Sequence, residues 1–404
     1  IAEIFQRNTI MLLHRSVTLM QFLRGPRITL KRMLHLDNGS EIIAQEVNGK
    51  GILTLNRPGA LNALSTSMIN DMKKYLQGWQ DKLSMVIIKV ITLHMYASLT
   101  VLYTLKGGPK AFCAGGDVRS VVNEIKAKKG DASQYFYNEY QLDYLTHTLK
   151  IPYISLIHGI VMGGGFGISV HGDFRVATES TLFAMPETAI GLIPDVGGSY
   201  FLSRLKNNIG MYLALTGHRL KGSDVMHCGV ATHYCDKILL DALETELLEL
   251  SNVTKKDISD ILDKYTNKAK TKSDDFSLAP HLVDINRIFS ANTLEEIIKA
   301  LEDSDTEWSR KQLNLLKKMS PLSMKVTLRQ IREGKDRSLD KCLRMEYGIV
   351  RKFCEGTEFP EGVRALLLDK DNTPNWNPPC IEEVTDDMVD EYFKPLPQHL
   401  QLVF

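Results

Sequence analysis

Two carboxylates, Glu187 and Asp195, lie close together in a stretch of the chain that is otherwise almost entirely apolar. Acidic side chains are seldom enclosed by Ala, Ile, Leu, Val and Gly unless they have a chemical task or a polar partner. Such a pair suits general acid–base catalysis or the attack of a carboxylate oxygen on an electrophilic carbon. Two plainer interpretations stay open, because Glu187 can be one half of an ion pair and Asp195 can cap a turn or helix that begins at Val196.

Glycines cluster in three segments around these carboxylates. The segments are KAFCAGGD at 110–117, HGIVMGGGFG at 158–167 and MPETAIGLIPDVGG at 185–198. A glycine cluster that follows a strand and precedes a helix leaves backbone N–H groups open to whatever approaches. Two clusters whose N–H groups converge on one oxygen form an oxyanion hole, the usual device of acyl chemistry. Tight helix–strand packing explains GGGFG equally well on its own, so it is the ordered trio that favours a site.

The chain lacks the signatures of several other enzyme classes. Neither a P-loop lysine nor a GxGxxG fingerprint accompanies the GGGFG run, and there is no HExxH zinc motif and no GxSxG nucleophile elbow. The six cysteines form no CxxC pair and no Cys/His cluster with zinc spacing. We therefore expect free thiols in a reducing compartment.

The composition favours neither nucleic acid nor a membrane as a partner. The 404 residues carry 49 Lys+Arg and 48 Asp+Glu, a formal net charge of +1, whereas proteins that bind nucleic acid tend to be basic. The uncharged apolar run at 90–105 is shorter than the roughly 20 residues that span a bilayer. With 44% hydrophobic residues, the chain is able to build a large core around a small-molecule site.

The hydrophobic pattern divides the chain into three regions. Residues 1–36 have the Arg-rich, acid-poor composition of a mitochondrial transit peptide, with 1–10 as an upstream extension, and a disordered basic tail is the alternative. Residues 37–235 alternate strand and helix patterns and predict an α/β core, which the run at 90–105 interrupts as an atypical insert. Residues 236–404 are amphipathic at helical spacing and predict a helical C-terminal region. The predicted strands are 42–47, 51–55, 85–90, 154–157 and 174–177, and the predicted helices of the core are 65–79 and 131–149.

Three motifs resemble those of the crotonase superfamily. They are FCAGGD, HGIVMGGGFGISVHG and FAMPETAIGLIPDVGGSYFLSRL, and they look most like the branch of the superfamily that hydrolyses 3-hydroxyacyl-CoA thioesters. The resemblance runs from about residue 40 to about residue 380. It implies a spiral of ββα units with an α-helical C-terminal region, and a site that binds a CoA thioester and stabilises its oxyanion.

The resemblance also assigns roles to single residues. The backbone N–H groups of Ala114 and Gly164 match the oxyanion donors of the superfamily. Enoyl-CoA hydratases of the superfamily carry two catalytic glutamates. Glu187 matches one of them, whereas the other falls at Gly167, which has no side chain. Asp195 instead falls where the hydrolase branch carries its second acid.

The implied reaction is hydrolysis of a thioester. Glu187 either attacks the thioester carbon, which gives a mixed anhydride, or activates a water as a general base. Asp195 orients the water or the substrate hydroxyl, or helps to protonate the leaving thiolate. Glu139 matches a substrate-contacting acid that would bind the 3-hydroxyl group, although an exposed helix acid is nearly as good an interpretation. Together with Gly164, these three carboxylates form the expected substrate-binding site.

The resemblance implies an enzyme of the mitochondrial matrix that takes the acyl-CoA (S)-3-hydroxyisobutyryl-CoA from valine degradation, with 3-hydroxypropionyl-CoA as a second substrate. No metal and no cofactor are expected, since CoA is part of the substrate. Whether the chain forms a homo-oligomer stays open.

Two other functions also stay open. An enoyl-CoA hydratase is disfavoured by Gly167, although Asp195 alone suits an isomerase. A non-catalytic part of a mitochondrial ribosome is disfavoured by the intact motifs and the balanced charge.

Overall fold

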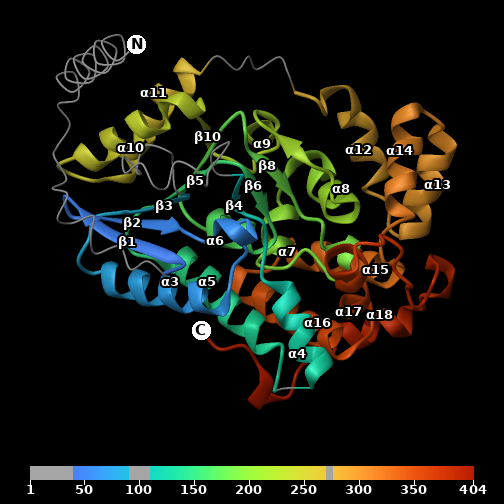
Figure 1. Cartoon of the computed structure of the whole chain (residues 1–404). Coiled ribbons are helices and arrows are strands. Elements are labelled where there is room, and N and C mark those ends of the chain that lie inside the picture. Colours follow the sequence, from blue (N-terminus) through green and yellow to red (C-terminus); the bar gives the residue numbers. More distant parts are fainter. Residues whose placement is uncertain (1–39, 91–109, 129, 270–275) are drawn as a thin grey trace, which may run out of the picture. The chain divides into compact units, whose positions relative to one another are not determined.

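Two β-sheets carry the glycine-rich segments. The computed structural model describes residues 40–90, 110–128, 130–269 and 276–404, and the described residues from Glu41 onward belong to one compact unit (Figure 1). The predicted transit peptide at 1–36 and the apolar insert, except for Val90, lie outside the described residues.

The larger sheet has six strands. In spatial order they are β1 (Ile42–Val47), β2 (Lys50–Leu55), β3 (Val86–Val90), β5 (Tyr153–Ile157), β7 (Phe174–Ala177) and β10 (His233–Tyr234). β1 and β2 are antiparallel, and Asn48 and Gly49 between them have φ angles of 50° and 73°, as a tight hairpin requires. The other neighbours are parallel, and every residue of β2, β3 and β5 is buried. Continuously buried strands are typical of a parallel sheet that is covered on both faces.

The smaller sheet has four strands, and the first three of them each follow a strand of the larger sheet along the chain. In spatial order they are β4 (Ala111–Cys113), β6 (Ile160–Met162), β8 (Leu182–Ala184) and β9 (Leu220–Lys221). The chain passes from β3 to β4 and α4, from β5 to β6 and α6, and from β7 to β8 and then to α7. This repetition confirms the predicted spiral of ββα units. The helices of the core are α3 (Thr66–Trp79), α4 (Val118–Ala127), α5 (Gln134–Thr148), α6 (Gly164–Val170), α7 (Gly198–Leu202), α8 (Ile209–Thr216) and α9 (Asp224–His227).

The C-terminal part is helical, as predicted. After β10, the described residues contain helices and connecting segments but no further strand. Ser320 accepts a hydrogen bond from the backbone N–H of Ser323 and so caps the helix that begins at Pro321, a favourable arrangement at a helix start. The C-terminal helices are α10 (Leu240–Glu249), α11 (Lys255–Lys268), α12 (Leu282–Ile288), α13 (Leu294–Ser304), α14 (Glu307–Leu316), α15 (Pro321–Gly334), α16 (Leu339–Glu355), α17 (Glu358–Val363) and α18 (Asp386–Tyr392).

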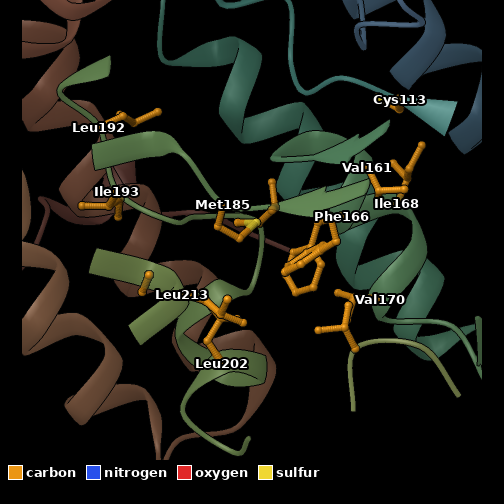
Figure 2. Packing of buried hydrophobic residues seen from close by; sticks show 14 of the residues in the cluster. Cys113, Val161, Phe166, Ile168, Val170, Met185, Leu192, Ile193, Leu202 and Leu213 are labelled. Carbon is orange, nitrogen blue, oxygen red and sulfur yellow. The ribbon is translucent and has the colours of Figure 1, made fainter. Parts of the chain in front are cut away.

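An apolar layer packs beside the glycine-rich segments. Figure 2 shows Phe166 of α6, Met185 after β8 and Leu202 of α7 among the buried side chains of this layer. The ring of Phe166 packs against those of Phe183 and Phe201, with centroids 5.4 Å and 5.3 Å apart. Burial of a large apolar side chain contributes about 1.5–3 kcal/mol. The layer therefore holds α6, β8 and α7 together. These elements border the two glycine-rich segments at 158–167 and 185–198.

Helices α7 and α8 approach so closely that only glycine fits at one position. A Cβ atom on Gly210, near the start of α8, would collide with the backbone oxygen of Leu202 at the end of α7. A backbone atom cannot move aside as a flexible side chain does. The contact therefore fixes α7, the helix that follows Asp195, against α8.

Replacing Gly210 with alanine should lower the free energy of unfolding by about 1–3 kcal/mol, because the added methyl group overpacks the contact with Leu202. Gly78→Ala in α3 is the matched control. A Cβ atom there meets nothing within 4 Å, and alanine is favoured over glycine in a helix by about 1 kcal/mol. Urea unfolding followed by circular dichroism measures both changes. Equal midpoints for the two variants would contradict the close contact.

Candidate active site

Glu187 begins a short 3₁₀ helix, η3 (Glu187–Ile190), which follows β8. The residue is 5% exposed, and within the described part of the chain its Oε2 atom has no hydrogen-bond partner. A Cβ atom on Gly163 would lie 2.9 Å from Oε1, so the carboxyl group lies against the glycine loop before α6. No Lys, Arg or His among the described residues pairs with it. The ion-pair interpretation of Glu187 is therefore wrong, and Oε2 has neither an ionic partner nor a hydrogen-bond partner there.

Asp195 lies in the turn between η3 and α7 and is 4% exposed. Tyr140 of α5 donates a hydrogen bond from its Oη atom to Asp195 Oδ2 at 2.7 Å. The N-cap of α7 is Gly197, and no side chain caps this helix. Asp195 therefore does not cap a helix, but it does begin a turn, because its carbonyl oxygen accepts a hydrogen bond from Gly198 N at 2.8 Å. The bond from Tyr140 sets the orientation of the carboxyl group.

Helix α5 places two carboxyl groups against α6. Glu139 is 2% exposed, so its interpretation as an exposed acid is wrong. Its Oε1 atom accepts a hydrogen bond of 3.4 Å from Tyr135, and a Cβ atom on Gly164 would collide with it. Asp143 lies one helical turn further along α5 and contacts α6 in the same way, because a Cβ atom on Gly167 would lie 2.8 Å from Asp143 Oδ1. Neither carboxylate oxygen of Asp143 has a hydrogen-bond partner in the described structure.

Two glycine-rich segments bring free backbone donors together. Among the described residues, the backbone N–H groups of Gly116 and Gly164 donate to no backbone acceptor. A Cβ atom on Gly164 would lie 3.2 Å from the Gly116 nitrogen, so the two residues are close neighbours. The predicted donor Ala114 differs, because its N–H donates to the carbonyl oxygen of Leu61 at 3.1 Å. Since a backbone N–H is a single donor, the geometry favours Gly116 over Ala114 as the partner of Gly164.

Five buried carboxyl groups share this interior. They are Glu139, Asp143, Glu187, Asp195 and, from α16, Glu346. Burial raises the pKa of Glu139, Asp143 and Glu187 well above the usual range, and the charges of neighbouring carboxylates add to the effect. Burial also raises the pKa of Asp195 to about 6, against the lowering effect of the Tyr140 hydrogen bond. It raises the pKa of Glu346 to about 8.

The size of two opposing effects explains why these pKa values rise. Moving an unpaired carboxylate out of water costs several kcal/mol, whereas a nearby helix N-terminus such as that of α6 returns only about 0.3–1 kcal/mol. Desolvation therefore dominates, and the groups retain protons to higher pH than free carboxylic acids. A site whose carboxyl groups differ in pKa supplies a general acid and a general base at the same pH.

The segment that carries Glu187 and Asp195 is held by α15. Three hydrogen bonds run from α15 and its N-cap to carbonyl oxygens of residues 188–194. They join Ser320 N to Thr188 O (3.0 Å), Ser323 Oγ to Leu192 O (2.5 Å) and Gln330 Nε2 to Pro194 O (2.5 Å). Hydrogen bonds that satisfy buried carbonyl groups keep an irregular segment in one conformation.

Tyr140, Asp143 and Glu346 belong to this cluster but were not predicted from the sequence. The sequence does contain a signal for Asp143, because it follows Glu139 at i, i+4 spacing and therefore lies on the same face of the helix. Tyr140 and Glu346 had none, since only the fold brings α5 and α16 to the Asp195 turn.

Neither a membrane-spanning helix nor a cluster of metal-binding side chains occurs among the described residues. No helix among them is long and apolar enough to cross a membrane. No group of three or more His, Cys, Asp or Glu side chains is arranged there to hold a metal ion.

Comparisons with known proteins agree with this geometry. Residues 50–393 match the family model described as Enoyl-CoA hydratase/isomerase. The chain is 48% identical over 369 residues to the mitochondrial 3-hydroxyisobutyryl-CoA hydrolase of Gallus gallus, which covers 91% of this chain and 92% of that protein. It is 45% identical to the Homo sapiens protein of the same name, over the same shares of each chain.

Two solved structures are similar over nearly their whole length. A carnitinyl-CoA dehydratase from Mycobacterium thermoresistibile has a TM-score of 0.78 at 32% identity and covers 91% of this chain and 99% of that one. An enoyl-CoA hydratase from Rhodobacter sphaeroides 2.4.1 has a TM-score of 0.78 at 30% identity and covers 90% of this chain and all of that one, 100%. The chain belongs to the enoyl-CoA hydratase/isomerase family, the crotonase superfamily that its motifs indicate. Both curated relatives carry the name of a hydrolase.

Asp143→Asn should make stability less sensitive to pH. A carboxyl group whose pKa is raised by folding stabilises the folded chain below its unfolded pKa of about 4, and this contribution is lost as the pH rises through the folded pKa. The midpoint of urea unfolding should therefore fall less between pH 5 and pH 9 in the variant than in the wild type. Buried histidines with lowered pKa values act in the opposite direction, but equally in both proteins.

Glu124→Gln is the control for this prediction, because Glu124 is an exposed acid of α4. Its pH dependence should match that of the wild type. An Asp143→Asn variant with the wild-type pH dependence would contradict a raised pKa for the buried carboxyl group.

Proposed function

We propose that this chain hydrolyses the thioester of 3-hydroxyisobutyryl-CoA to the free acid and CoA, with 3-hydroxypropionyl-CoA as a second substrate. The names of its curated relatives support this substrate. The observation that carries the proposal is the free Oε2 atom of buried Glu187, beside a glycine loop whose neighbour Gly164 lies close to Gly116. Acyl transfer requires a nucleophile or a general base together with donors for the oxyanion. A carboxylate next to two backbone N–H groups that have no acceptor meets both requirements.

The reaction follows from these groups. The thioester carbonyl oxygen binds to the N–H groups of Gly116 and Gly164, which stabilise the negative charge that develops on it. Glu187 acts on the carbonyl carbon in one of two ways. Its Oε2 atom attacks directly, so that a C–O bond of a mixed anhydride forms as the C–S bond breaks, and water then hydrolyses the anhydride. Alternatively, Glu187 takes a proton from a water molecule that attacks the same carbon.

The other carboxyl groups complete the proposed site. Asp195, held by Tyr140, orients the attacking water or the substrate hydroxyl, or returns a proton to the leaving thiolate. Glu139 lies against Gly164, where a bound acyl chain would present its 3-hydroxyl group. Because its pKa is raised, Glu139 either accepts a hydrogen bond from this hydroxyl or, when protonated, donates one. The proposed chemistry calls for no metal and no redox cofactor.

The local packing disfavours hydration by two carboxylates. A side chain at position 167 would begin 2.7 Å from the Val196 Cβ atom and 2.8 Å from Asp143 Oδ1. The space that a second glutamate needs is therefore already filled. We place the reaction in mitochondria, as a step of valine degradation, because the curated relatives are named mitochondrial and residues 1–36 have the composition of a transit peptide.

Glu187→Gln should reduce the release of free CoA thiol from 3-hydroxyisobutyryl-CoA by about 10²–10⁴-fold. The amide keeps the shape of the side chain but is neither a nucleophile nor a base. Glu124→Gln is the matched control and should keep wild-type activity. The assay is run beside one that follows the double bond of crotonyl-CoA. Consumption of crotonyl-CoA without thiol release from the first substrate would reassign the chain as a hydratase.

Gly164→Ala should lower kcat by about 10²–10³-fold, the usual effect of losing one oxyanion donor. The methyl group would lie 3.2 Å from the Gly116 nitrogen and would collide with Glu139, so it fills the space between the two donors. Gly78→Ala controls for the change of residue type, and the melting temperature of each variant separates loss of activity from loss of fold. An active and folded Gly164→Ala protein would refute this oxyanion hole.

A further inference from the structure

The turn that carries Asp195 has a strained backbone. Val196 has a φ angle of +52° and the following Gly197 one of +79°. A β-branched residue in the left-handed region is a true outlier, and such conformations persist only where the surroundings impose them. The strain is adjacent to a proposed catalytic carboxylate, so the groups that impose it bear on the reaction.

Glu346 binds this turn from α16. Its carboxylate accepts a hydrogen bond from Gly197 N at 2.7 Å and from Ser199 N at 2.9 Å, and the Ser199 hydroxyl donates a third at 2.5 Å. Glu346 is fully buried, with a relative exposure of 0%. An apolar side chain would fill the same volume but would leave two buried backbone N–H groups without an acceptor, which is costly. The turn therefore needs an acceptor such as the Glu346 carboxyl group at this position to keep its conformation.

His171 also binds the backbone of Val196. His171 donates from its Nε2 atom to the Val196 carbonyl oxygen at 2.7 Å. A Cβ atom on Gly197 would collide with the His171 ring, so the two sides of the turn are enclosed. With Glu346 on the N–H groups after Val196 and His171 on its carbonyl oxygen, the turn has little freedom to relax.

We propose that Glu346 is a positioning residue of the reaction, which holds the strained turn at Val196 so that Asp195 meets Tyr140. It touches no substrate and acts through Asp195. The inference rests on the proposed function for its kinetic readout, but its structural readout is independent of any activity.

The ionisation of Asp195, followed by infrared spectroscopy, is the most direct measure of this role, because the acidic limb of kcat/KM also reports the ionisation of Glu187. The Tyr140 hydrogen bond lowers the pKa of Asp195, whereas burial raises it. If the turn relaxes, Asp195 loses that bond and its pKa rises. The groups that interact with Asp195 are Tyr135, Glu139, Tyr140 and Asp143 of α5, Glu187 of η3, and Glu346 and Cys354 of α16.

Three variants test the proposal in the full chain: Glu346→Ala, Tyr140→Phe and the double variant. Tyr140→Phe removes the donor itself, so the pKa of Asp195, followed by the carboxylate infrared band that Asp195→Asn abolishes, should rise. Glu346→Ala should move it in the same direction, lower kcat by about 10²-fold, as a misplacement of about 1 Å does, and leave KM within about twofold. The double variant should show no further shift, because both changes break the same contact. Glu346→Gln, which keeps one acceptor, should show a smaller effect and carries the test if the alanine variant fails to fold.

Glu355→Gln is the matched control, because Glu355 is an exposed acid on the same helix, and it should leave kcat and the pKa of Asp195 unchanged. A crystal structure of Glu346→Ala supplies the readout that needs no activity, with the distance from Tyr140 Oη to Asp195 expected to exceed 3.5 Å, and in Glu346→Gln the distance should lengthen less. An inactive wild type would refute the proposed function and leave this distance to decide the inference. An intact Tyr140–Asp195 bond in the alanine variant, an unshifted pKa of Asp195, or additive shifts in the double variant would each overturn the positioning role.

Discussion

The enclosure of several carboxyl groups without a cationic partner is the constraint on which this site depends. A buried carboxylate that lacks an ion pair must be hydrogen-bonded or protonated, since the cost of leaving it charged and bare is several kcal/mol. Both solutions occur here. Asp195 accepts a hydrogen bond from Tyr140. Glu346 accepts hydrogen bonds from the Asp195 turn, although burial still raises its pKa to about 8. Asp143 has no hydrogen-bond partner among the described residues, and burial raises its pKa, so protonation is what stabilises it there.

Much of the architecture serves this enclosure. The glycines at 163, 164 and 167 allow carboxyl groups to approach α6 as closely as backbone atoms permit. The helical C-terminal region supplies the polar groups that an irregular, buried segment requires: α15 donates to its carbonyl oxygens, and Glu346 of α16 accepts from its N–H groups. The ββα core positions the glycine-rich segments, and the helices that follow hold the acidic segment against them.

The different environments of the carboxyl groups give them different chemical uses. Asp195 receives a phenolic hydrogen bond and has a pKa near 6, so it is largely ionised at neutral pH. Glu139 and Glu187 have more strongly raised pKa values. In the proposed reaction Glu187 first loses its proton, and the raised basicity of the resulting carboxylate then favours attack on the carbonyl carbon or removal of a proton from water. The same crowding fills the space beside Gly167 with Asp143 and Val196, so the packing that raises the pKa values also limits which reaction the site supports.

The amino-acid sequence by itself determined the family, the spiral of ββα units, the helical C-terminal region and the pair Glu187 and Asp195, because these depend on local patterns and on short motifs. It left open an ion pair for Glu187, a helix cap for Asp195 and an exposed position for Glu139, and only the structure excludes these alternatives, since burial is decided by elements distant along the chain. It also favoured Ala114 as an oxyanion donor, and only the fold shows that this N–H is bound to Leu61 while that of Gly116 is open. The partners Tyr140 and Glu346 carry no local signal, because they reach the Asp195 turn from α5 and α16. Which backbone donors are free, and which acids face one another, are properties of pairs of atoms that only tertiary packing brings within hydrogen-bond distance.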